Sequence, residues 1–144
     1  MTNFDIVAAA GAPLTAIDKT FPVTVTNGLI SIQFVTGPAN FPKVSAIEVT
    51  QLPAFSPIFV NAGGPAYTDT AGNHWNADVD FSGGGAAATT SAIANTADPT
   101  LYKTERYGAF LYQFGVPNGS YNVLLKFAEI YWTKAGQRLS LIHI

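Results

Sequence analysis

The sequence contains no cysteine among its 144 residues. Disulfide bonds, thiol nucleophiles, zinc ribbons and iron–sulfur clusters are therefore excluded. Charge is also scarce, since 11% of the residues are charged and the formal net charge is -2. Phosphate binding needs clustered lysine and arginine, so nucleic acid is not an expected partner. No apolar stretch reaches the roughly 18 to 20 residues that cross a bilayer, so membrane insertion is not expected either.

What the chain does contain is enough apolar material for one folded domain. Apolar residues make up 48% of the sequence, which supports a packed core and argues against disorder. Few lysines and glutamates, with many small and β-branched residues, are typical of β-rich extracellular modules. The predicted location is extracellular or the cell surface, although residues 1–5 have neither the basic start nor the apolar run of a signal peptide.

Alternation of apolar and polar residues predicts an all-β protein. Asn27-Gly28 predicts a hairpin with a type I′ turn, and residues 117–120 predict the tight turn of a second hairpin. No helix is predicted. Two hairpins separated by a long loop indicate an antiparallel β-sandwich of jelly-roll type. The expected strands are residues 21–26, 29–35, 44–50, 58–61, 110–116 and 121–132.

Two segments are predicted to lack strands. Pro53 and Pro57 bracket a stretch that cannot pair in the middle of a sheet, so residues 51–57 are the predicted linker. Residues 67–100 are rich in Asp, Asn, Thr and Gly and include the glycine–alanine run of residues 83–88. A loop of this length within a compact domain is usually functional.

The aromatic pair Tyr131-Trp132 is the first candidate site. Sugar rings present flat faces of C–H groups edged by hydroxyls, which aromatic rings and polar side chains complement. Neighbouring residues of a regular strand point to opposite faces, so both rings meet one ligand only if the strand ends before them. The alternative is that Tyr131 packs in the core and Trp132 covers an edge, and composition does not choose between the two.

Other polar groups give weaker signals. Asp69, Asn73, Asp78 and Asp80 offer oxygen ligands, but their spacing does not match a calcium-binding loop and such residues commonly form turns, so no metal and no cofactor is expected. Glu105 and Arg106 suit a structural ion pair. Glu105 and Glu129 are the only nominees for a glycosidase carboxylate pair, and no motif constrains them. The protein is therefore not predicted to be an enzyme.

Several segments together resemble the malectin domain, a carbohydrate-binding β-sandwich that recognises glucose-containing oligosaccharides in its animal form. In bacteria, similar modules occur in large extracellular proteins. The resemblance implies non-catalytic binding of an oligosaccharide or polysaccharide, with neighbouring modules of a parent chain as further partners. The segments that carry it are residues 60–64 (VNAGG), 67–78 (YTDTAGNHWNAD), 102–107 (YKTERY) and 119–132 (GSYNVLLKFAEIYW).

The order of the segments implies a circularly permuted arrangement. Residues 3–11, the Asn27-Gly28 turn and residues 40–48 resemble the back half of the same domain, but they precede the front half. The chain therefore resembles the C-terminal half of one repeat (residues 1–50), the linker, and the N-terminal half of the next (residues 58–139), closing into one sandwich. Residues 140–144 resemble translated sequencing adapter and are expected to be a non-native tail.

The resemblance also implies the sugar-binding residues. Tyr107, Tyr131, Trp132 and Asn40 stand where the family has two tyrosines, a phenylalanine and an aspartate. Asparagine keeps an acceptor but loses the charge, which weakens hydrogen bonding to hydroxyls. A further family tyrosine is expected around residues 83–89, where this chain has only Gly, Ala and Thr. A structural or adhesive spacer that has lost its sugar site is therefore the alternative function.

Overall fold

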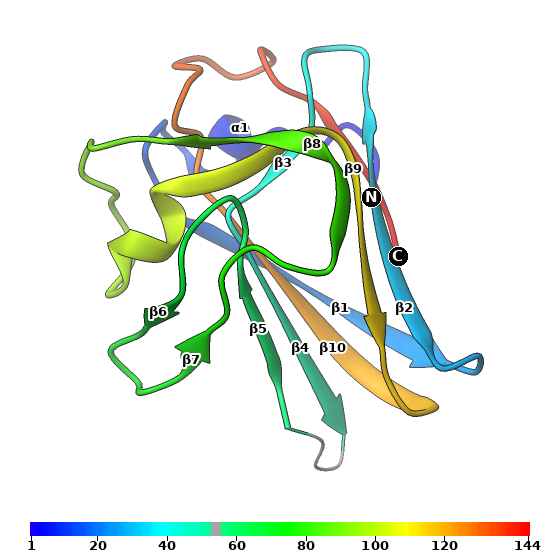
Figure 1. Cartoon of the computed structure of the whole chain (residues 1–144). Helices are drawn as coiled ribbons and strands as arrows, with labels where there is room; N and C mark the ends of the chain where they lie inside the picture. Colours follow the sequence, from blue (N-terminus) through cyan, green and yellow to red (C-terminus); the bar gives the residue numbers. More distant parts are fainter. Residues whose placement is uncertain (53–55) are drawn as a thin grey trace.

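The computed structural model describes residues 1–52 and 56–144, and these form an antiparallel β-sandwich (Figure 1). One sheet has the order β1-β10-β4-β5, and the other has the order β11-β2-β9-β3 with β8 also paired to β9. Strands β6 and β7 form a small separate sheet. The strands are β1 (Ile17–Val25), β2 (Leu29–Thr36), β3 (Lys43–Val44), β4 (Ala46–Leu52), β5 (Ile58–Asn61), β6 (Tyr67–Thr68), β7 (His74–Trp75), β8 (Phe81–Ala88), β9 (Thr104–Gly115), β10 (Gly119–Phe127) and β11 (Ser140–His143).

The core lies between the two main sheets and follows the predicted alternation. In β10, every second side chain from Tyr121 to Phe127 is buried, while Asn122 and Lys126 are less buried. In β2, Ile30, Ile32 and Phe34 are buried in the same way. Full burial of one such side chain contributes about 1.5–3 kcal/mol. The all-β prediction and the predicted sandwich are therefore confirmed.

Both predicted hairpins are wrong. Strand β1 pairs with β10 rather than β2, and β2 pairs with β9 and β11, so residues 26–28 connect the two sheets. Residues 116–118 connect β9 to β10 across the sandwich in the same manner. Gly28 has a φ of 75°, whereas Asn27 has no positive φ, so the turn is not type I′. Turn residues allow the chain to reverse, but they do not determine which strand pairs with β1. Strand β1 pairs with β10 over nine residues instead.

The glycine–alanine run predicted as loop is strand β8. It pairs with β9 through a bulge between Gly83 and Gly85, where Gly83 and Gly84 adopt positive φ angles. A Cβ on Gly83 would lie 2.8 Å from the carbonyl oxygen of Ala109, so the close approach requires glycine. Glycine is depleted in strands, which is why the sequence pattern did not indicate one here.

A buried ion pair anchors β8 to β9. The Arg106 guanidinium donates through Nε and Nη2 to Asp78 Oδ2, at 2.9 and 2.5 Å, and through Nη1 to the Gly83 carbonyl at 2.9 Å. Tyr112 donates its hydroxyl to Asp78 Oδ1 at 2.5 Å. The Phe81 ring lies 3.3 Å from the Arg106 Cζ atom. Asp78, Arg106 and Tyr112 are called the β8 anchor cluster below.

Two short helices also depart from the prediction. Helix α1 (Ile6–Ala10) is capped at its N-terminus by Asp5, whose side chain accepts a hydrogen bond from Ala8 N at 3.0 Å. Its C-terminal cap is Gly11, which adopts the left-handed conformation. Both are ordinary capping residues, but five residues are too few to reveal a helical period. A 3-10 helix spans Pro99–Tyr102. Neither described helix is long and apolar enough to cross a membrane.

Strands from both ends of the chain interleave in each main sheet (Figure 1). Strand β4 pairs with β5, as expected for residues 44–50 and 58–61. Of the predicted linker, Gln51 and Leu52 belong to β4, and residues 53–55 lie outside the described residues. Strand β11, within the predicted tail, pairs with β2 and buries Ser140 and Ile142. The division of the chain into parts of two successive repeats stays a prediction.

Candidate functional site

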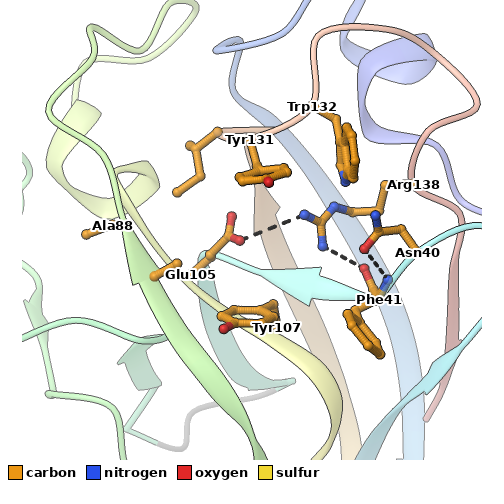
Figure 2. Close-up of a pocket in the computed structure, with 10 residues that line it drawn as sticks. Asn40, Phe41, Ala88, Glu105, Tyr107, Tyr131, Trp132 and Arg138 are labelled. Atoms are coloured by element: carbon orange, nitrogen blue, oxygen red, sulfur yellow. Dashed lines mark hydrogen bonds and ion pairs between the residues drawn. The ribbon is translucent and has the colours of Figure 1, made fainter.

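The four predicted site residues lie around one cavity. It has a volume of about 390 Å³ and lies where β3, β8, β9 and the segment after β10 meet (Figure 2). Asn40, Tyr107, Tyr131 and Trp132 come from three segments that are distant in sequence. The other lining residues are Phe41, Ala87, Ala88, Glu105, Ile130 and Arg138.

The rings of Tyr131 and Trp132 form one wall. Strand β10 ends at Phe127, before these residues, so the rings are not forced to opposite faces of a sheet. Their centroids are 4.9 Å apart with an interplanar angle of 83°. Tyr131 is 73% exposed, which excludes the alternative that it packs in the core. Glu129 holds this turn, because its Oε1 atom accepts from the backbone N–H groups of Tyr131 and Trp132, both at 3.0 Å.

Tyr107 and Phe41 bound the other side of the cavity (Figure 2). Tyr107 lies in β9 opposite Lys43 of β3 and is half-exposed. Gly85 of β8 leaves room for this ring, since a Cβ there would lie 3.0 Å from Tyr107 Cζ. Phe41 is 50% exposed, and the sequence analysis did not identify it as a site residue. Aromatic surface thus faces the cavity from two directions.

Asn40 lies at the rim in the left-handed conformation, with a φ of 60°. Asparagine tolerates this conformation better than most residues. Its Oδ1 atom accepts from Phe41 N at 2.8 Å, so the side chain is fixed relative to the neighbouring ring. The carbonyl oxygen of Phe41 in turn accepts from Arg138 Nη1 at 2.6 Å.

Four buried charged residues lie beneath the aromatic walls: Lys43, Glu105, Glu129 and Arg138, called the charged floor below. All are at most 6% exposed. Arg138 Nε donates to Glu129 Oε2 at 2.6 Å, and Lys43 forms an ion pair with Glu105. The Lys43 ammonium also donates to the Ala128 carbonyl at 2.5 Å. These contacts join the segment carrying Tyr131 and Trp132 to β3 and β9.

Burial lowers the pKa of Lys43 to about 7. Removal of the ammonium from water is the main cause, because desolvation disfavours the charged form. Glu129 raises this pKa and partly offsets the effect, while Arg138 lowers it further. Lys43 and Arg138 were not predicted as site residues. For Lys43 a signal was available, because it is a charged residue at the start of an apolar strand, and a charge in such a position is rarely buried unless it is paired. Arg138 lies in an irregular segment and has no comparable local signal.

The model of the malectin domain family matches residues 56–143. The chain belongs to this family. Human malectin is 35% identical over 88 residues, which are 56% of this chain and 30% of that protein. Malectin-B of Xenopus laevis is 32% identical over 93 residues, which are 59% of this chain and 34% of that protein. No solved structure matches significantly.

Membership of the malectin family confirms the resemblance and supports a carbohydrate-binding, lectin-like module. This chain spans about a third of the length of the curated relatives it matches. The match includes three of the four predicted site residues, because Asn40 precedes residue 56. The role of residues 1–50 as part of a preceding malectin repeat therefore rests on the sequence resemblance.

The two carboxylates nominated as a glycosidase pair are both engaged with cations. Glu129 accepts from Arg138 through one oxygen and from two backbone N–H groups through the other. Glu105 faces Lys43. A general acid must carry a transferable proton close to the bond that breaks. An ion-paired carboxylate holding a turn is suited to positioning rather than to proton transfer.

Asp69 and Asp78, two of the three aspartates considered as calcium ligands, form hydrogen bonds to other groups of the protein. Asp69 accepts from the backbone N–H groups of Ala71 and Asn73 and from the side chains of Asn73 and Trp75. Burial raises the pKa of Asp69, but these hydrogen bonds outweigh it and the pKa lies below its usual value. Asp78 belongs to the β8 anchor cluster. Within residues 1–52 and 56–144, no group of three or more histidine or acidic side chains is placed to hold a metal ion.

Proposed function

We propose that this malectin-family chain binds carbohydrate without catalysis, at the cavity bounded by Tyr107, Tyr131, Trp132 and Asn40. The observation that carries the proposal is the convergence of these residues, from three distant segments, on one cavity. A group of exposed aromatic rings around one cavity commonly marks a binding site, and Phe41, Tyr107 and Tyr131 form such a group. The side chain of Tyr131 is 73% exposed.

The proposed ligand is a glucose-containing oligosaccharide or a polysaccharide segment. The C–H faces of a pyranose complement the Tyr131 and Trp132 rings, and its hydroxyl edge complements polar groups at the rim and floor of the cavity. Ala87 and Ala88 line the side where the family resemblance implies a further tyrosine. With one aromatic contact fewer, the expected affinity is weak and the preferred disaccharide differs from that of the animal form.

We further propose that the chain is a module of a larger extracellular protein with tandem malectin-like repeats. The resemblance of residues 1–50 and 58–139 to parts of two repeats supports this proposal. The alternative function is a structural or adhesive spacer that keeps the fold but no longer binds sugar. Ala87, Ala88 and the uncharged Asn40 favour that alternative.

Titration with gluco-oligosaccharides tests the proposal. Of the two tryptophans, Trp75 is buried, so a change in intrinsic fluorescence on binding reports mainly Trp132. For the wild-type protein we expect weak but saturable binding by calorimetry and fluorescence. Calorimetry of Trp132→Ala should show affinity reduced at least about tenfold, since stacked aromatic surface is lost. Phe81→Ala is the matched control, because Phe81 is 40% exposed and lies outside the cavity. Absence of binding to every glycan of an array would support the spacer instead.

A further inference from the structure

The charged floor has an opening between two of its members. Arg138 Nη2 and Glu105 Oε1 are 4.0 Å apart, which is too far for a direct hydrogen bond. Both residues line the cavity, and their side chains are 6% and 3% exposed. Figure 2 shows the Glu105 carboxylate and the Arg138 guanidinium facing each other across the cavity, between the Tyr131 and Tyr107 rings.

These two groups have hydrogen-bonding capacity that the described protein atoms leave unused. Arg138 donates through Nε to Glu129 and through Nη1 to Phe41, whereas Nη2 makes no hydrogen bond to a described residue. Glu105 has the Lys43 ion pair on Oε2, but no described N–H or O–H group makes a hydrogen bond to Oε1. A carboxylate has about four lone-pair positions that can accept hydrogen bonds.

Trp132 adds a third unused group beside the same cavity. Its Nε1 atom is buried and has no hydrogen-bond partner among the described residues. Figure 2 places the indole nitrogen at the end of the ring nearer Arg138. An indole N–H is a donor only. One acceptor and two donors beside the cavity therefore make no hydrogen bond to another described residue, and of these three atoms the indole nitrogen is the one that is itself buried.

A hydroxyl group fits the opening between Arg138 and Glu105. A hydroxyl oxygen about 2.8 Å from both Glu105 Oε1 and Arg138 Nη2, which are 4.0 Å apart, would make an angle of about 90° between its two hydrogen-bond partners. A hydroxyl both donates and accepts, so it can donate to Glu105 Oε1 and accept from Arg138 Nη2. Neither a carboxylate nor an ammonium group satisfies both partners, because the first offers no donor and the second no acceptor.

We infer that Glu105 and Arg138 are ligand-binding residues that bracket one sugar hydroxyl and make that hydroxyl the specificity determinant of the cavity. The inference rests on the proposed carbohydrate binding and adds its chemical selectivity. The aromatic walls accept many pyranose faces, whereas the floor selects neutral sugars that carry a free hydroxyl at one position. Trp132 Nε1 supplies a donor for a second sugar oxygen near it.

Deletion of single hydroxyls from the ligand tests this without disturbing the protein. A panel of glucose disaccharides differing in linkage is titrated first, and the tightest is then replaced by each of its monodeoxy derivatives. Hydrogen bonds to charged groups contribute more than neutral ones, so one position is expected to weaken binding at least about tenfold. Removal of any other hydroxyl is expected to leave the dissociation constant within about threefold of that of the parent disaccharide.

A protein variant then assigns that position to the floor. In Glu105→Gln the carboxylate charge is lost. The loss of affinity caused by removing the critical hydroxyl from the sugar is therefore expected to be at least about threefold smaller than in the wild-type protein. Glu48→Gln is the matched control, because Glu48 is also partly buried but lies in β4 outside the cavity. Circular dichroism establishes that each variant is folded. If Glu105→Gln does not fold, Arg138→Lys is compared with the wild-type protein in the same way, and the monodeoxy series on the wild-type protein can still overturn the inference.

The outcomes separate the two proposals. If the disaccharides bind and Trp132→Ala weakens them, but all monodeoxy derivatives bind within about threefold of the parent, the hydroxyl-bracketing inference is wrong and the proposed function stands. An unchanged penalty in folded Glu105→Gln also overturns the inference. If no disaccharide binds the wild-type protein, the proposed function fails and the inference fails with it.

Discussion

The β8 anchor cluster and the charged floor are both buried groups built around a charged residue of β9, yet they differ in how completely their polar atoms are paired. In the anchor cluster, each Asp78 oxygen accepts a hydrogen bond, and Arg106 donates through Nε, Nη1 and Nη2. In the charged floor, Arg138 Nη2 and Glu105 Oε1 remain 4.0 Å apart. Glu105 and Arg106 are adjacent in sequence, yet Glu105 belongs to the incompletely paired charged floor and Arg106 to the anchor cluster.

Burial of charge therefore does not by itself indicate function. A cluster in which every charged nitrogen and oxygen atom has a protein partner fixes one strand against another. Burial and the Asp78 hydrogen bond raise the pKa of Tyr112, which keeps this hydroxyl a donor. A cluster with unused donors and acceptors next to a cavity is instead suited to binding a polar molecule. Perturbation of each cluster should therefore have different consequences.

The largest expected effect is the loss of stability in Asp78→Ala. The change leaves the buried Arg106 guanidinium without its partner, and breaking a buried pair in this way costs about 3–5 kcal/mol. Urea denaturation measures the free energy of unfolding. The folded fraction should keep the wild-type affinity for gluco-oligosaccharides, because Asp78 does not line the cavity. A stability change below about 1 kcal/mol would contradict a structural role for the anchor cluster.

The next effect is a pH dependence that arises from Lys43. Its pKa is about 7 in the folded protein against 10.5 for an ordinary lysine. Between these values the unfolded chain binds more protons than the folded chain, so the free energy of unfolding rises with pH. Below about pH 7, Lys43 is charged in both states, and the cost of burying its charge no longer changes with pH. From pH 7 to 9, the loss of this proton raises the free energy of unfolding by about 2 kcal/mol.

Lys43→Met isolates this contribution. The variant removes the titrating group, so the rise in unfolding free energy from pH 7 to 9 should be smaller than in wild type by about 2 kcal/mol. Urea denaturation at pH 6, 7, 8 and 9 measures both proteins, and Lys126→Met provides a control at a lysine on the surface of β10. Parallel stability profiles for wild type and Lys43→Met would contradict the assignment of the slope to Lys43.

The sequence was sufficient to predict the alternating core strands and the aromatic wall, but not the other strands, the pairing of the strands or the charged floor. Alternation in residues 121–127 reflects burial on one face, which is a local property. The pairing of β1 with β10 depends on residues about 100 positions apart, so the local turn at Asn27-Gly28 was misleading. Strand β8 was missed because its glycines are set by the close approach of β9 rather than by strand propensity.

The candidate site was also only partly predictable from the sequence. The family resemblance placed Tyr107, Tyr131, Trp132 and Asn40, and the fold brings these four together. The charged floor combines Lys43, Glu105, Glu129 and Arg138 from segments up to 95 residues apart, and the pairing of one charge with another over such distances has no local pattern. Only the folded arrangement distinguishes the paired Arg106 from the partly unpaired Glu105.

The smallest expected effect is a gain in affinity in Asn40→Asp, which adds a charge to the rim of the incompletely paired cluster. Aspartate also tolerates the left-handed conformation of residue 40, and its carboxylate retains the bond from Phe41 N. Because a carboxylate makes stronger hydrogen bonds to hydroxyls than an amide does, the dissociation constant for the tightest glucose disaccharide should fall about threefold. Asn3→Asp is the matched control, since Asn3 has a φ of 52° and lies outside the cavity. Calorimetry of both variants measures the effect. Unchanged binding in Asn40→Asp would place the ligand away from this rim, and weaker binding would contradict hydrogen bonding of the new carboxylate to a sugar hydroxyl.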